Sequence, residues 1–230
     1  MKQKDYLLIT FITLGLLLFI WFEGSRQWYL DFNSQHGMIT SFFKFGILAT
    51  FGEMLGLRIR KGIYYEPAFG VFPKFIVWGF LGLTIKMAFV VFASGTPIFM
   101  EYMGIADASA SMKAAFTAKK LAVAFAISVA MNVIYAPVMM TFHKITDSHI
   151  QSHQGQWVSL LKPIRFAADF QGINWNIQWH FVFKKTIPFF WIPAHTITFL
   201  LPTDFQVLFA ALLSVMLGLI LAIASLKSKN

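Results

Sequence analysis

The stretch FIVWGFLGLTIKMAFVVFA, residues 75–93, decides the fold class of this chain. It is almost entirely apolar, and Lys86 is its one charged side chain. A helix needs about 20 mainly apolar residues to cross the hydrocarbon core of a bilayer. We therefore expect residues 75–93 to form a transmembrane helix.

The composition extends this expectation to the whole chain. Of its 230 residues, 57% are hydrophobic and only 13% are charged, and the mean hydropathy is +0.65. Soluble domains carry about 25% charged residues. A deficit of this size indicates lipid-facing surface and leaves no room for a separate soluble domain. We predict a single membrane domain over residues 1–230.

Apolar runs of similar length predict an all-α membrane protein, a bundle of about six transmembrane helices. The longest polar connection, residues 143–185, carries aromatic and apolar residues at helical spacing next to lysines, so we expect it on the inner side, partly at the membrane interface. Plain cytoplasmic loop packing of this connection is the alternative. The expected helices lie near residues 6–22, 38–57, 75–93, 119–142, 186–201 and 206–225.

The distribution of basic residues predicts that both termini lie on the inner side. Cytoplasmic loops of membrane proteins are enriched in lysine and arginine. With six helices, the outer loops contain only Arg26 and Lys113. The inner ends and connections contain Lys2, Lys4, Arg58, Arg60, Lys61, Lys74, Lys144, Lys162, Arg165, Lys184, Lys185, Lys227 and Lys229.

Small residues recur on one face of three expected helices and predict close helix packing. A small-residue pore lining is the alternative use of such a stripe. The stripes are Gly46, Ala49, Gly52 and Gly56; Ala118, Ala122, Ala126 and Ala130; and Ala210, Ser214, Gly218 and Ala222.

Polar side chains at membrane depth are expensive and are candidates for function. The candidates for a pore or gate are Lys86, Glu53, Asn132, His195 and Pro193. Lys86 and Glu53 either form a structural pair or line a polar path. His195 lies between prolines of an expected kinked helix, because each proline removes a backbone donor. Such a helix should be buried or line a cavity.

Signals for an enzyme are weak, and we expect no catalytic activity and no cofactor. The chain has no cysteine and no P-loop, GxGxxG or GxSxG motif. His149 and His153 are four residues apart, near His143 and Asp147, so a metal site there is conceivable. No HExxH signature accompanies them, and we expect no metal. A membrane enzyme that uses these histidines is the third functional hypothesis.

Motifs over roughly residues 44–225 resemble the Mpv-seventeen/peroxisomal-membrane-protein-twenty-two family of small membrane proteins. They are WGFLGL from Trp78 to Leu83, KKL from Lys119 to Leu121, NW at Asn174–Trp175 and PFFWIPAHTITFLLP from Pro188 to Pro202. The matching positions are Gly79, Gly82, Trp191, Pro193, Phe199 and Pro202. Thr198, Gln206 and Lys86 depart from the residues common in that family.

The resemblance implies channel-like, weakly selective passage of small solutes across a membrane. The N-terminus lacks the Arg- and Ser-rich pattern of a mitochondrial presequence. We therefore expect a bacterial-type member in the cytoplasmic (inner) membrane, with an organelle membrane as the alternative. The expected partners are membrane lipids and, for an oligomeric pore, further copies of the chain, but no nucleic acid. The alternative function is a non-transporting scaffold that binds a partner or lipid through residues 143–185.

Overall fold

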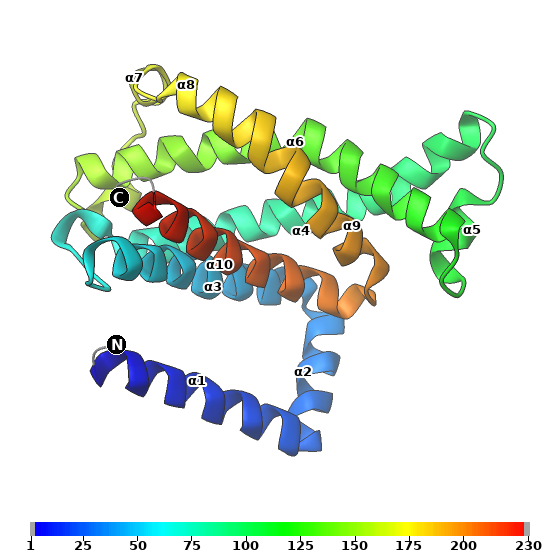
Figure 1. Cartoon of the computed structure of the whole chain (residues 1–230), viewed down its shortest axis with the longest axis horizontal. Coiled ribbons are helices and arrows are strands. Elements are labelled where there is room, and N and C mark those ends of the chain that lie inside the picture. The colour runs from blue at the N-terminus through cyan, green and yellow to red at the C-terminus, as the bar shows by residue number, and fades with distance from the viewer. Residues whose placement is uncertain (1–2, 228–230) are drawn as a thin grey trace. The chain divides into compact units, whose positions relative to one another are not determined.

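A computed structural model describes residues 3–227 of the chain (Figure 1). Helices make up all the regular structure in these residues, which confirms the predicted all-α class. The chain divides into two compact units, Met1–Thr40 and Ser41–Asn230, and the single membrane domain predicted from composition stays a prediction.

The first unit contains one helix that the apolar pattern predicts and one that it misses. α1 (Gln3–Trp21) matches the expected helix at 6–22, and α2 (Glu23–Gln35) follows at an angle of 87°. Phe22 separates them in an extended conformation. Because α2 is mostly polar, a search for membrane-length apolar runs cannot find it.

The second unit contains three long helices and most of a fourth, α3, which begins at Gly37. They are α3 (Gly37–Lys61), α4 (Val71–Tyr102), α6 (Ala118–Ser152) and α10 (Thr203–Lys227). Each contains a stretch long and apolar enough to span a membrane, and the bent pair α1 and α2 would make a fifth. The helices are therefore those of a membrane-spanning protein. The count of about six crossings and the N-in/C-in orientation stay predictions.

Shorter helices connect these four. Those between α3 and α6 are η1 (Pro67–Phe69) and α5 (Ala108–Lys113). Those between α6 and α10 are η2 (Trp157–Leu161), α7 (Phe166–Gln171), α8 (Trp175–Ile177), η3 (Gln178–Trp191) and α9 (Ile192–Leu200).

Two of the long helices continue beyond their predicted ends. α4 runs through Pro97 to Tyr102, beyond the predicted end at residue 93. α6 runs to Ser152, so the connection after it begins later than residue 143. An apolar run identifies the part of a helix that can lie in lipid. The residue at which the helix ends is determined by backbone geometry instead. After α6 this geometry is the left-handed conformation of Gln154 and Gly155.

The fifth predicted segment, 186–201, is the second half of a longer helical stretch. η3 is a π-helix that contains Pro188, and it passes into α9 at Ile192. Prolines in membrane helices are tolerated when neighbouring groups or local π geometry satisfy the freed backbone. Ser128 on α6 also holds this stretch, because its hydroxyl donates to the Ile192 carbonyl at 2.7 Å.

Small residues bring α3 close to both α4 and α10 (Figure 1). A Cβ at Gly52 would lie 2.9 Å from Val215 Cα on α10. On α4, Cβ atoms at Gly79 and Gly82 would lie 2.4 and 2.7 Å from the side chains of Phe42 and Phe45. The predicted alanine stripe on α6 is not a continuous seam, because Ala118 and Ala122 are exposed while Ala126 packs against the core. The buried face of α6 lies one residue further, at Val123 and Ile127.

The α3–α10 contact yields a test of helix packing. Gly52→Ala is expected to lower the free energy of unfolding by about 1–3 kcal/mol, the usual cost of overpacking. Gly56→Ala, one turn along, is the matched control because its nearest neighbours would lie 3.7 Å from the new Cβ. Denaturant unfolding of both variants in detergent measures the difference. Equal stability of the two variants would contradict a close contact at Gly52.

Candidate functional site

The core of the second unit encloses a cavity between α3, α4, α6, α10 and the η3–α9 segment. It contains about 500 Å³ of space that no atom fills, its opening included. Most of its lining is aromatic, methionine or small and apolar. Polar atoms belong to Trp78, Asn132, Tyr135, Trp191, His195 and Ser214, but nearly all of the exposed lining surface is apolar. We call this space the core cavity.

Asn132 and His195 form the central polar pair of the core cavity. Asn132 is fully buried on α6, and His195 on α9 is buried as well. The Nδ1 atom of His195 lies 3.0 Å from Nδ2 and 3.2 Å from Oδ1 of Asn132. Asn132 Nδ2 also donates to the Ser128 carbonyl at 2.8 Å. The pair thus joins two helices that are far apart in sequence.

Aromatic rings hold His195 in place. The Trp191 ring stacks on it with centroids 5.1 Å apart, and the Phe89 ring meets it edge-on at 5.7 Å. Trp191 Nε1 is buried and has no hydrogen-bond partner among the described residues. A buried N–H without a partner is uncommon in folded proteins, so Trp191 brings an unsatisfied donor to the lining of the cavity.

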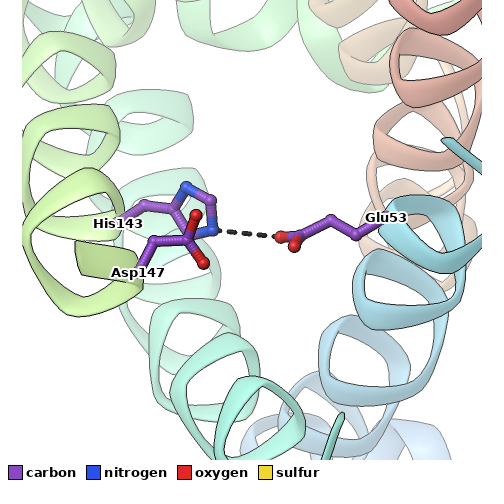
Figure 2. Close-up of side chains that lie close together, drawn as sticks. All are labelled: Glu53, His143 and Asp147. Atoms are coloured by element: carbon purple, nitrogen blue, oxygen red, sulfur yellow. Dashed lines mark hydrogen bonds and ion pairs between the residues drawn. The ribbon is translucent and has the colours of Figure 1, made fainter. Parts of the chain in front are cut away.

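A second polar group lies where the C-terminal half of α3 meets α4 and α6. Lys74 Nζ donates to Glu53 Oε2 at 2.6 Å and also pairs with Asp147. His143 Nε2 lies 3.2 Å from Glu53 Oε1. Figure 2 shows Glu53 pointing from α3 toward His143 and Asp147 on α6. We call Glu53, Lys74, His143 and Asp147 the charge cluster.

Trp78 connects the core cavity to the charge cluster. Its ring lines the cavity, and its Nε1 donates to Glu53 Oε1 at 2.7 Å. The same ring lies against His143 with centroids 4.3 Å apart. One side chain therefore separates an apolar chamber from a group of four ionisable residues.

Glu53, His143 and Asp147 each offer a ligand atom, and these atoms lie within 4.8 Å of one another. Carboxylates and imidazole are common metal ligands. However, the Lys74 ammonium already lies between the two carboxylates. A metal ion would have to displace it. The arrangement is therefore best described as an ion-pair network around Lys74.

The structure brings some predicted site residues together and separates others. Asn132 and His195 meet in the core cavity, while Glu53 belongs to the charge cluster. The Lys86–Glu53 pair does not form, because Glu53 binds Lys74, Trp78 and His143 instead. Lys86 is half-buried on α4, does not line the cavity, and interacts electrostatically with Lys44.

Pro193 is exposed at the start of α9 and contributes backbone geometry rather than a cavity wall. The other motif positions have packing roles. Phe199 is buried against Phe89, Gly79 and Gly82 receive the phenylalanines of α3, and Pro202 follows the end of α9.

Sequence reasoning missed the central cation, Lys74, which it used only to orient the chain. Lys74 and Trp78 are four residues apart, as are His143 and Asp147, so each pair shares a helix face. That spacing was the available signal. His149 and His153 do not join the cluster: the His149 Nε2 atom bonds the Ser159 carbonyl at 3.0 Å, and His153 Nδ1 bonds the His149 carbonyl.

No protein-family model, curated protein or solved structure matches this chain. The geometry of the core cavity and the charge cluster therefore carries the functional argument.

Proposed function

We propose that this protein is a small channel-like integral membrane protein that allows weakly selective passage of small solutes. The observation that carries the proposal is the core cavity, which brings polar side chains together inside a bundle of apolar helices. Buried polar groups at membrane depth are costly and mark pathways or cavities more often than they mark packing. Asn132 and His195 are such groups.

In this proposal the charge cluster closes one end of the path. Trp78 forms the partition between the cavity and the cluster, and Glu53 holds the indole N–H. Opening requires the Trp78 ring to swing away while the Lys74 ion pairs keep α3, α4 and α6 together. Side-chain rotation of this kind needs no rearrangement of the helices.

The motif resemblance agrees with this function, and we propose membership of the Mpv-seventeen/peroxisomal-membrane-protein-twenty-two family on that basis. A bacterial cytoplasmic membrane is the proposed location, with an organelle membrane as the alternative. The path we propose runs through one chain, although a homo-oligomer could place several such paths side by side.

A second function is favoured by the surface between α6 and η3. Trp157, Leu161, Trp175 and Trp179 are exposed there. Lysines and arginines accompany them, and Lys184 lies over the Trp179 ring at 5.6 Å. Aromatic and basic side chains together suit a membrane interface. A non-transporting scaffold that binds lipid or a partner through residues 143–185 would use this surface.

Solute flux into proteoliposomes tests the channel proposal. Wild-type protein is expected to speed the entry of small uncharged solutes, followed by vesicle swelling. Ala136→Phe is expected to slow entry about tenfold or more, because a solute must then overpack the cavity that Ala136 lines, at about 1–3 kcal/mol. Lys86→Leu is the control and should keep wild-type flux, since Lys86 lies outside the cavity.

Wild-type protein without flux would overturn the channel proposal. Retention of a lipid or partner that requires residues 143–185 would then favour the scaffold. Equal flux through wild type and Ala136→Phe would show that solutes take another route.

A further inference from the structure

We propose that the core cavity binds a small uncharged molecule with an apolar body and one hydrogen-bond acceptor, such as a medium-chain alcohol. This inference rests on the proposed function and names the class of solute that the path accepts. The charge, the hydrogen bonding and the shape of the cavity lining restrict which molecules it can bind.

The lining excludes ions. Among the described residues, the lining contains no Asp, Glu, Lys or Arg side chain. A buried charge without a partner is far more costly than a buried neutral polar group. In the charge cluster, Lys74 already binds Glu53 and Asp147. The Trp78 indole lies between them and the cavity, with its N–H directed at Glu53. An ion in the cavity would find no counter-charge.

The unpaired donor in the lining favours a ligand that carries one hydrogen-bond acceptor. Trp191 is 9% exposed, and its Nε1 has no partner among the described residues. Several other polar groups of the lining have partners: Trp78 bonds Glu53, and Tyr135 bonds Thr84 at 2.7 Å. Asn132 bonds Ser128 and His195. A hydroxyl or carbonyl oxygen on the ligand would accept a hydrogen bond from the Trp191 N–H.

The rest of the lining suits an apolar body. Phe45 and Phe89 supply flat apolar walls, while Met131, Met139 and Met140 line the α6 side. Methionine side chains are flexible and adapt to irregular shapes. The empty space of about 500 Å³ includes the opening of the cavity. An ordered water could accept the hydrogen bond of the Trp191 N–H, but it would make no apolar contact with these walls.

Photolabelling of the full-length protein in detergent tests the proposal. The probe is octanol that carries a diazirine, and mass spectrometry locates the label. We expect label on the cavity side of α6, between Met131 and Met140. Unlabelled octanol should compete for this label, whereas octylammonium and octanoate, of equal chain length but charged, should not.

Two variants test the assignment of the site. Trp191→Phe should weaken the competition by octanol about fivefold, the effect of one neutral hydrogen bond. Trp179→Phe is its control, since Trp179 is exposed on the same helix. Ala136→Phe should abolish the label by filling the cavity. If Trp191→Phe fails to fold, Ala136→Phe and the charged competitors still decide.

Label spread over the lipid-facing helices, or equal competition by octylammonium, would overturn the inference. Flux without cavity label would remove this site while leaving the channel proposal standing. Cavity label without flux would support the site and remove the transport role.

Discussion

Replacing Lys74 with methionine is expected to lower the free energy of unfolding by about 3–5 kcal/mol, the cost of breaking a buried ion pair from one side. The Lys74 side chain is only 4% exposed, and its ammonium binds both Glu53 and Asp147. Methionine fills similar space but leaves two carboxylates near each other without a cation. Because the three residues belong to α4, α3 and α6, the loss affects three helices at once.

Lys61→Met is the matched control for Lys74→Met. Lys61 also pairs with a glutamate, Glu66 at 2.7 Å, but the two side chains are 55% and 34% exposed. Exposed pairs contribute about 0–1 kcal/mol. Denaturant unfolding in detergent compares the variants, and equal losses would contradict a structural role for Lys74. Adding Glu53→Gln to Lys74→Met should recover part of the loss, since the two sites are coupled.

Gly155→Ala is expected to lower the free energy of unfolding by about 2–5 kcal/mol. Gly155 has φ 68°, a left-handed conformation that costs other residues about 1–2 kcal/mol. A Cβ there would also lie 2.6 Å from the backbone nitrogen of Gly70, which cannot move aside as a flexible side chain could. Overpacking of this kind adds about 1–3 kcal/mol. The change would separate η1 from the end of α6.

Gly104→Ala separates the two contributions. Gly104 has φ 94°, yet nothing lies within 4 Å of a Cβ built on it. Gly104→Ala should therefore lower the free energy of unfolding only by the cost of the left-handed conformation. Thermal unfolding in detergent and proteolysis of the segment after α6 measure the difference. A loss at Gly104 as large as that at Gly155 would show that the contact with Gly70 is unimportant.

The positions of the membrane-spanning stretches follow from the sequence, whereas helix ends do not. Hydrophobicity identifies the part of α4 and α6 that suits lipid. It does not report Pro97 inside α4 or the polar last turns of α6, because a helix continues until the backbone geometry changes. The polar helix α2 gives no such signal at all. The π-helix η3 also lies outside what a search for apolar runs detects.

The candidate site shows the same division. Sequence reasoning singled out Glu53, which lies in the charge cluster, and Asn132 and His195, which line the core cavity. It paired Glu53 with Lys86 and missed Lys74, which lies just outside the predicted helix 75–93. The partner of Glu53 depends on how α4 is rotated and shifted along α3, which Gly79 and Gly82 set by receiving Phe42 and Phe45.

By itself, the sequence determined that the chain is a helical membrane protein, because the transfer of apolar side chains out of water is a local property that adds along the chain. The tertiary structure alone decided which polar groups meet. It placed Lys74 between Glu53 and Asp147 and left Trp191, in the cavity lining, with an Nε1 that has no partner among the described residues. Hydrogen bonds and ion pairs act over a few ångströms, so they depend on packing between residues that the sequence separates widely.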